Sequence, residues 1–254
     1  MKAIGIIGYK KSGKTTLAVA LAKALKIRGY RIAMVKHTNE PLDHGHSDSG
    51  QFIENSSQVA VISPKNVSII LGDSHLKNAY SFFSADFLII EGFKKAKNYP
   101  KIICLRNKDE ETELSDGLEL FKAGMNDSLK DKKAVDYLIT SNTDIEEMVN
   151  QIEKKGFLLP DINCGECGYQ NCYGLAKAIV KGVASEKDCI YSKNNISITV
   201  NKRKIFLNSF LSQLYKNIIY GMLSSLKDVN SLNQAKIEIE LKMEKNSKEA
   251  IEQH

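Results

Sequence analysis

The sequence predicts an α/β fold with a largely parallel sheet, followed by two smaller domains of different character. Three observations predict it. Residues 8–15 read GYKKSGKT and fit the pattern G-x-x-x-x-G-K-[ST]. A short apolar run at 3–7 precedes the pattern, as in a strand buried on both faces, and apolar residues recur at helical spacing over 16–28. Strand, glycine-containing turn and helix in this order predict a phosphate-loop NTPase domain.

The turn between this strand and helix has the composition of a phosphate site. Gly8 and Gly13 allow the backbone to approach a ligand that a side chain would keep away. Backbone N–H groups and the positive end of the helix dipole then face one point. The ammonium group of Lys14 can reach the β- and γ-phosphates, and the hydroxyl of Thr15 can ligate Mg²⁺. The stretch therefore predicts a nucleotide site.

Composition and charge limit the other functions. The 254 residues are 43% hydrophobic and 26% charged, as in soluble globular proteins. The net charge of +6 is small and spread along the chain, so we expect no nucleic-acid partner. The densest basic cluster, Lys94, Lys95, Lys97 and Lys101, is interpreted as a solvated loop in preference to an anion-facing patch. No targeting or membrane-spanning stretch is recognised, so we expect a cytoplasmic protein with no membrane partner.

A second predicted strand at 31–35 leads toward a polar loop at 41–50. The loop follows the strand on the sheet edge that carries the phosphate turn, where α/β folds hold ligands. Together with the strand end it offers several potential metal ligands: His37, Asp43, His44, His46 and Asp48. No helical spacing orders these side chains, so a switch loop beside the nucleotide is favoured over a metal site.

Two short strands at 58–62 and 67–71 follow, separated by four residues. The short connection predicts a hairpin, which would make the sheet mixed rather than purely parallel. A short helix is expected next, at 74–83.

The second strong signal is the apolar run at 87–90 that ends in Glu91. A buried parallel strand of this kind delivers an acid to its carboxyl end, where the acid can bind Mg²⁺ or position the attacking water. Gly92 lets the chain turn sharply past a nucleotide. Asp86, at the opposite end of the strand, is expected to be structural.

Another strand is predicted at 101–105, in which Cys104 is interpreted as a small buried hydrophobe. Residues 107–110 (NKDE) follow directly. They match the guanine-reading pattern Asn-Lys-x-Asp imperfectly, because Glu110 stands where aspartate is expected. An ordinary charged turn is therefore favoured.

The first predicted domain, residues 1–156, closes with a strand at 134–139 and a helix at 143–155. Gly156 marks its end. Beyond this point the pattern changes to a cysteine-rich segment.

Four of the five cysteines lie in the second predicted domain, residues 157–192, with the spacing C-x₂-C-x₄-C-x₁₆-C. They are Cys164, Cys167, Cys172 and Cys189. In a reducing compartment such a cluster indicates a metal site rather than disulfides. Zinc sites usually pair two C-x₂-C knuckles and only one is present, so an iron–sulfur cluster is favoured over Zn²⁺.

The third predicted domain, residues 193–243, is a small β-β-α-β module. Strands are expected at 196–200, 205–207 and 237–241, with a helix from about 208 that carries an apolar face. No residue pattern in the module indicates catalysis, so we interpret it as a docking or dimerisation element. Residues 244–254 form a charged tail.

Several stretches carry a family resemblance. They are the loop from Gly8 to Thr16, the sequence VKHT at 35–38, Gly45 with Asp48 and Ser49, and EGFK at 91–94. With them the first domain resembles the molybdopterin-guanine dinucleotide biosynthesis protein B family of phosphate-loop GTPases. Residues 157–191 are similar to the Cys₄ [4Fe–4S] domain of corrinoid iron–sulfur proteins, matching it at the four cysteines and at Leu158, Pro160, Gly165, Gly168, Ala176 and Gly182.

The resemblance implies a weak GTPase that acts mainly as an adapter. Lys14 and Glu91 would be catalytic, and Thr15 and Glu91 would hold Mg²⁺. GTP would be bound by Gly8, Lys11, Ser12, Gly13, Lys14, Thr15, Thr16, His37, Asp48 and Gly92. A [4Fe–4S] cluster would be held by Cys164, Cys167, Cys172 and Cys189. The partner would be molybdenum cofactor guanylyltransferase, or a molybdenum or tungsten enzyme that receives the cofactor.

Two other hypotheses stay open on the residues alone. In the first, the nucleotide gates electron transfer from the cluster to a redox partner. In the second, the chain is a metallochaperone GTPase that uses His37, His44, His46 and Asp48 as a transfer site. A homodimer is compatible with each of them.

Overall fold

The computed structural model describes residues 1–38, 58–62, 67–71, 83–131, 133–190, 196, 198–200, 203–205, 207 and 209–226. The chain divides into two compact units, residues 1–193 and 194–254, which we describe separately. The loop with His44, His46 and Asp48, the helix expected at 74–83 and the strand expected at 237–241 lie outside the described residues.

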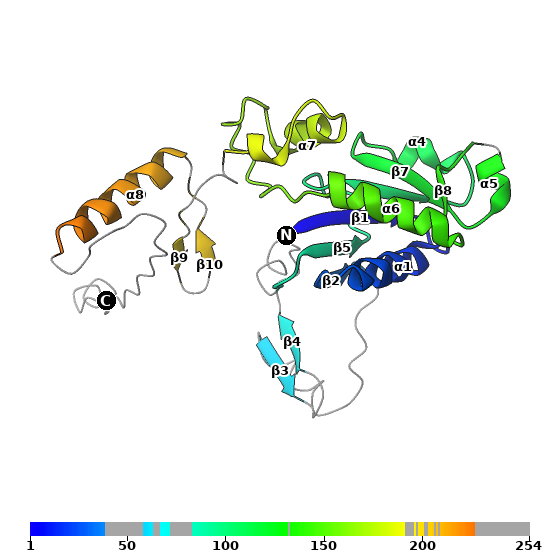
Figure 1. Ribbon diagram of the computed structural model, residues 1–254, viewed down its shortest axis with the longest axis horizontal. Coiled ribbons are helices and arrows are strands. Elements are labelled where there is room, and N and C mark those ends of the chain that lie inside the picture. The colour runs from blue at the N-terminus through cyan, green and yellow to red at the C-terminus, as the bar shows by residue number, and fades with distance from the viewer. Residues whose placement is uncertain are drawn as a thin grey trace, which may run out of the picture. The chain divides into compact units, whose positions relative to one another are not determined.

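The centre of the first unit is a six-stranded sheet with the order β2-β5-β1-β6-β7-β8 (Figure 1). Its strands are β1 (Lys2–Gly8), β2 (Ile32–Lys36), β5 (Phe87–Glu91), β6 (Lys101–Leu105), β7 (Glu119–Gly124) and β8 (Tyr137–Leu138). Every pairing in this sheet is parallel. The three central strands are almost entirely buried, which explains their continuous apolar sequences. The carboxyl ends of β1 and β5 therefore meet at one edge.

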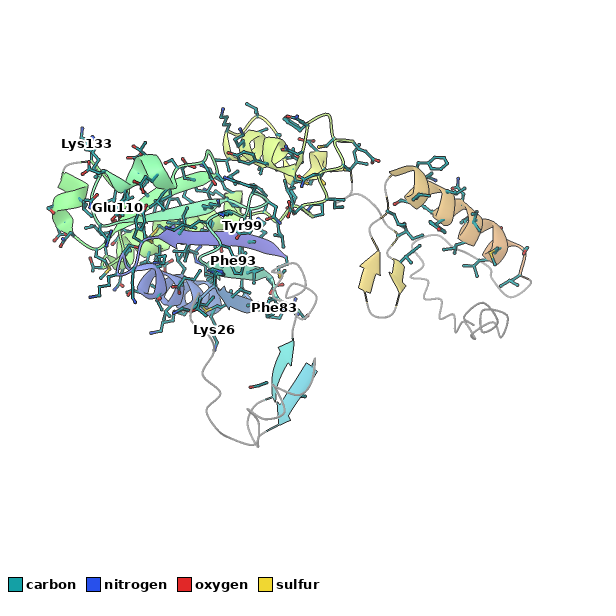
Figure 2. The ribbon with its side chains drawn as sticks, turned by 180° about the vertical axis from the view of Figure 1, so that it is seen from behind. Lys26, Phe83, Phe93, Tyr99, Glu110 and Lys133 are labelled. Atoms are coloured by element: carbon teal, nitrogen blue, oxygen red, sulfur yellow. The ribbon has the colours of Figure 1, made fainter. Side chains whose placement is uncertain are left out.

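Successive side chains of β1 face opposite sides of the sheet, and each side has its own cover. Ile4 and Ile6 pack in a core with α1 (Lys14–Ile27) and α6 (Asn142–Lys155), which lie side by side on one face (Figure 1). Ile7 packs instead with α4 (Glu110–Leu114) and α5 (Asp127–Asp131). Tyr99, labelled in Figure 2, is fully buried on this second side with Ala3 and Leu88.

Two expectations about this sheet are wrong. The strands β3 (Gln58–Ile62) and β4 (Val67–Leu71) do form an antiparallel hairpin, but the hairpin is a separate two-stranded sheet. The main sheet is therefore purely parallel and not mixed. In addition, the strand expected at 134–139 is reduced to Tyr137–Leu138, and β7 was not expected at all.

The cysteine segment belongs to the first unit and packs against the part that contains the sheet. It contains α7 (Cys172–Val180) and the 3₁₀ turn η1 (Glu186–Asp188). Its apolar side chains form a core with Leu118, which precedes β7. The Asn98 side-chain amide donates to the Leu159 carbonyl oxygen at 2.8 Å, and the Leu159 N–H donates to the Asn98 carbonyl oxygen at 2.8 Å. This reciprocal pair fixes the start of the segment.

The second unit contains an antiparallel hairpin, β9 (Ile198–Val200) and β10 (Arg203–Ile205), and the helix α8 (Ser209–Ser224). The returning strand begins two residues earlier than the sequence indicated. Large apolar side chains of α8 are exposed, among them Phe210 at 70% and Met222 at 66%. Within the described part of the chain, no helix is long and apolar enough to cross a membrane.

Candidate functional site

The loop between β1 and α1 can be built only with glycine at two positions. Gly8 has a φ of 155°, and a Cβ there would lie 2.5 Å from both the Cys104 carbonyl oxygen and the Ser12 hydroxyl oxygen. Gly13 has a φ of 88°, and its carbonyl oxygen accepts from Leu17 N–H at 2.9 Å to begin α1. The loop therefore presses tightly against β6 and turns directly into a helix, as a phosphate cradle requires.

Lys14 is the first residue of α1, and its ammonium group lies over the loop. Its Nζ donates to the Tyr9 carbonyl oxygen at 2.5 Å. Burial lowers the pKa of Lys14, and the nearby carboxylate of Glu91 partly offsets this effect. An anion beside the loop would favour the charged form of this amine. The group is therefore placed to meet a phosphate.

Glu91, at the end of β5, faces Thr15 across this edge of the sheet. The Thr15 hydroxyl lies 3.0 Å from both carboxylate oxygens of Glu91, and Lys36 Nζ lies 4.0 Å from one of them. A hydroxyl and a carboxylate are oxygen ligands that suit Mg²⁺, which also keeps waters and takes phosphate oxygens. Among the described residues, no three His, Cys, Asp or Glu side chains lie close enough to hold a metal ion without such additional ligands.

His37 and Gly92 lie next to Glu91, but as neighbours in the backbone. His37 N–H donates to the Glu91 carbonyl oxygen at 2.9 Å, and its ring packs on Phe93 with centroids 4.6 Å apart. Gly92 has a φ of 95°, and a Cβ there would lie 2.8 Å from the Cβ of His37. The sharp turn after Glu91 therefore depends on glycine. Of the other predicted site residues, Lys11 and Thr16 are exposed beside the loop, Ser12 is buried in it, and Asp48 lies outside the described residues.

Glu110, the last residue of the imperfect guanine-reading pattern at 107–110, is bound to a neighbouring arginine. Glu110 is labelled in Figure 2 and is only 7% exposed. One of its oxygens accepts from Arg106 Nε at 2.5 Å, and the other accepts from the Arg106 backbone N–H at 3.0 Å. Because both carboxylate oxygens are occupied, Glu110 positions Arg106. The ordinary-turn interpretation agrees with this geometry, and Arg106 is a residue that the sequence did not single out.

Lys101 contradicts the interpretation of the basic cluster as a solvated loop. It is fully buried, and its Nζ lies 2.5 Å from Asp116 Oδ2 and 2.8 Å from the Lys94 carbonyl oxygen. Lys97 also pairs with Asp116, at 2.7 Å. Burial alone would raise the pKa of Asp116, but the hydrogen bonds from the two lysines outweigh it and lower that pKa.

Asp116 also contacts the cysteine segment. Its carbonyl oxygen accepts from the Tyr173 hydroxyl at 2.5 Å. The Tyr173 ring lies between two ammonium groups, with its centroid 4.4 Å from Lys177 Nζ and 4.8 Å from Lys97 Nζ. Tyr173 follows Cys172 in α7, so the ion pair of the first domain reaches the cysteine helix directly.

The sulfur of Cys172 lies in a polar backbone environment. Burial raises the pKa of Cys172 above its ordinary value, and N–H groups of Asn163 and Ile162 only partly offset this rise; the Asn163 nitrogen lies 3.4 Å from the sulfur. Backbone N–H groups directed at a sulfur stabilise thiolate ligands and cluster sulfides. Cys167 and Cys189 belong to the same packed cluster, and Cys164 is exposed on the adjoining loop. Among the residues that the structure describes, no three His, Cys, Asp or Glu side chains are grouped closely enough to hold a metal ion, so the structure does not bring the four cysteines together as a ligand set.

Comparison with known proteins places this geometry in a family. Residues 3–123 match the sequence model of MobB, molybdopterin guanine dinucleotide synthesis protein B. Over 250 residues the chain is 32% identical to the "Putative molybdopterin-guanine dinucleotide biosynthesis adapter protein" of Methanocaldococcus jannaschii, a match that covers 95% of this chain and 98% of the relative. The chain belongs to the MobB family. Residues 159–191 also match a family model described as "Putative Fe-S cluster".

Other MobB relatives match the first domain alone. The molybdopterin-guanine dinucleotide biosynthesis adapter protein of Haemophilus influenzae is 33% identical over 118 residues, which are 41% of this chain and 64% of the relative. The crystal structure of Bacillus subtilis MobB superposes with a TM-score of 0.50 at 20% identity, covering 59% of this chain and 98% of that one. The latter match shows a shared fold. The phosphate loop and Glu91 lie within the MobB match, and the four clustered cysteines, from Cys164 to Cys189, lie beyond it.

Proposed function

We propose that this MobB chain is a GTP-binding adapter protein in the biosynthesis of molybdopterin guanine dinucleotide, with an attached iron–sulfur cluster. The near full-length relative named as an adapter in that pathway supports the proposal. The observation that carries it is the pairing of Thr15 with Glu91 beside Lys14, 3.0 Å from hydroxyl to carboxylate. A nucleoside triphosphate with Mg²⁺ needs a cation, a hydroxyl and an acid at such a site.

The proposal assigns finer roles to these groups. The loop holds the phosphates, Lys14 neutralises their charge, and Thr15 and Glu91 hold Mg²⁺. The family resemblance implies slow hydrolysis, with Lys14 and Glu91 as the catalytic residues. The cluster is assigned as [4Fe–4S] on four cysteines, and such thiols stay reduced in the cytoplasm. The expected partner is the guanylyltransferase that attaches GMP to molybdopterin.

A binding experiment tests the nucleotide part. Titration with a fluorescent GTP analogue, competed by GTP or ATP, should give tight binding that prefers GTP and weakens when EDTA removes Mg²⁺. Lys14→Ala should lose at least tenfold in affinity, while Lys23→Ala, an exposed lysine on the same helix, should bind normally. ATP binding as tight as GTP binding, or full affinity in Lys14→Ala, would remove this assignment.

Two further measurements test the remaining parts. The protein should be purified anaerobically and analysed for iron, sulfide and zinc. About four iron and four sulfide ions per chain are expected for [4Fe–4S]. Stoichiometric zinc without sulfide would exclude the cluster. Calorimetric titration against the guanylyltransferase, with and without GTP, should detect a complex, and no heat in either condition would count against the adapter role.

A further inference from the structure

A hollow of about 260 Å³ lies next to the phosphate loop, on the side of β6 and β7. It is lined by Lys11, Ser12, Leu105, Arg106, Met125, Asn126 and Leu129. Lys11 and Ser12 belong to the phosphate loop, Leu129 lies in α5, and the others end or follow β6 and β7. Because the strands are parallel, their carboxyl ends meet at the edge where the phosphates would lie. The hollow is therefore continuous with the proposed phosphate site.

The volume of the hollow suits one ring system. It is slightly below the roughly 300 Å³ at which pockets begin to hold whole drug-sized ligands. Leu105 and Leu129 supply buried apolar wall, and Met125, which is 43% exposed, adds a polarisable thioether. A flat aromatic heterocycle would fit these surfaces, and the lining also contains two cationic side chains, Lys11 and Arg106.

Ser12 adds a buried hydroxyl group to the lining, and a ligand or a water molecule would supply its hydrogen bond. Its side chain is 1% exposed, and its hydroxyl oxygen has no hydrogen-bond partner in the described part of the chain. A buried hydroxyl without a partner costs free energy. The wall of the hollow thus carries unused hydrogen-bonding capacity at its inner end.

The planar guanidinium group of Arg106 is restrained by its neighbours. Glu110 accepts from Nε and from the backbone N–H, and the Lys10 carbonyl oxygen accepts from Nη1 at 3.4 Å. Its guanidinium carbon also lies 5.4 Å from the centroid of the Tyr9 ring. A guanidinium group restrained in this way is a suitable surface for stacking on a nucleobase. Glu110 would therefore contribute to base binding only by positioning Arg106.

Asn126 completes the set, because it is the only side chain of the lining that can both donate and accept through a planar amide. It lies two residues after the end of β7, and its carbonyl oxygen accepts from the Leu129 N–H at 3.0 Å at the start of α5, which fixes its backbone. An amide pairs with a base edge that presents a donor beside an acceptor. Either purine presents such an edge.

We propose that this hollow is the nucleobase subsite of the phosphate-loop site, with Arg106 stacking on a purine ring and Asn126 reading its edge. The inference rests on the proposed function, since it needs a nucleotide whose phosphates occupy the loop. It replaces residues 107–110 as the base-reading element. Asn107 serves as the matched control, because its side-chain oxygen accepts from the Asp109 N–H at 3.1 Å within its own turn.

The test compares ligands with and without a base on the full-length protein. GDP, ADP and inorganic tripolyphosphate are titrated against wild type, Asn126→Ala, Asn126→Asp and Asn107→Ala, with circular dichroism to check folding. Asn126→Ala should weaken GDP about five- to tenfold and leave tripolyphosphate unchanged. Asn126→Asp, which only accepts hydrogen bonds, should raise the preference for GDP over ADP, because guanine presents adjacent donors. Asn107→Ala should change none of these affinities.

Two results would overturn the subsite. One is an equal loss of affinity for GDP and for tripolyphosphate in Asn126→Ala, or no loss of affinity for either ligand. The other is a selective loss of GDP in Asn107→Ala, which would return base reading to residues 107–110. Failure of wild type to bind any of the three ligands would overturn the phosphate site itself, and with it the proposed function, so the two failures are distinguishable.

Discussion

Asp116→Asn removes the charge that balances a fully buried ammonium group. Lys101 has 0% exposure, and in the native protein its Nζ contacts Asp116 Oδ2 at 2.5 Å and the Lys94 carbonyl oxygen at 2.8 Å. After the substitution only uncharged oxygens would remain as direct partners. Removing one member of a buried pair costs about 3–5 kcal/mol, because the remaining charge stays desolvated. We expect the variant to lose free energy of unfolding in that range at pH 7.

The reverse substitution should cost less. In Lys101→Met the Asp116 carboxylate keeps Lys97 at 2.7 Å and is still 14% exposed, and the methionine fills most of the volume of the lysine stem. A cost of roughly 1–2 kcal/mol is expected, since no charge is left buried without a partner. The double variant should be more stable than Asp116→Asn alone, because it contains no buried ammonium group. Lys97→Met, which removes a partly exposed partner, is the matched control and should cost less than about 1 kcal/mol.

The pH dependence of the free energy of unfolding follows from the pKa of Lys101. Burial lowers this pKa below its ordinary 10.5, and the hydrogen bond that Lys101 donates to Asp116 partly restores it. Between the native pKa and 10.5 the unfolded chain binds more protons than the native one, so stability rises with pH in that window. Loss of Asp116 lowers the native pKa further. The stability gap between wild type and Asp116→Asn should therefore narrow as pH rises from 7 toward 10.

Urea unfolding followed by far-ultraviolet circular dichroism measures these differences at pH 7 and pH 9.5. Each variant is prepared anaerobically as the full chain. A loss below about 1 kcal/mol in Asp116→Asn at pH 7 would show that Lys101 is not held as a buried charge. A gap that widens with pH would contradict the sign of the argument. Either result would also weaken the role given to this pair at the cysteine segment.

Three other predictions can be checked directly. Gly8→Ala should abolish binding of a fluorescent GTP analogue, because its Cβ would lie 2.5 Å from the Cys104 carbonyl oxygen; unchanged affinity would contradict the loop geometry. Cys104 should resist iodoacetamide in the native protein, since burial raises its pKa to about 12, whereas the exposed Cys164 of cluster-free protein should react, as mass spectrometry can show. The pKa of Asp86, measured by NMR, should be about 2, because Arg31 donates hydrogen bonds to its carboxylate. Arg31→Gln should raise that pKa toward 3.8. The stability that this contact contributes is present above pH 3.8 and is lost as the pH falls toward 2.

The sequence predicted those parts of the fold in which local pattern and burial agree. β1, the glycine turn and α1 follow from an apolar run, two glycines and helical spacing, and β5 follows from four apolar residues before Glu91. The expectation that Cys104 is a buried hydrophobe is confirmed, with 0% exposure. Each of these signals lies within about ten residues, and the parallel core places them together without further information. Lys14, Thr15 and Glu91 were expected at one edge of the sheet for the same reason, because the carboxyl ends of parallel strands meet there.

The features that the sequence did not predict depend on contacts between distant segments. β7 has the sequence ELFKAG, in which partly exposed and buried residues mix, so it lacks the apolar run of a central strand. The hairpin at 58–71 was identified, but no local signal says whether a hairpin joins the main sheet. Lys101 looks like part of a basic loop until Asp116, fifteen residues later, is brought beside it. Arg106 likewise gains a role only from Glu110 and the hollow beside the phosphate loop.

The buried ion pair has a geometric consequence at the cysteine segment. Lys101 binds the Lys94 carbonyl oxygen in the segment that follows Glu91, and Asp116 binds Tyr173 of α7 through its own carbonyl oxygen. A buried pair of this kind adds little net stability over apolar residues, but its directional bonds fix the relative positions of the parts it joins. Here those parts are the loop beyond the strand-end acid and the helix that begins at Cys172. An apolar pair would stabilise the same core without defining this register, which is a physical reason for a lysine at a site where burial disfavours its charge.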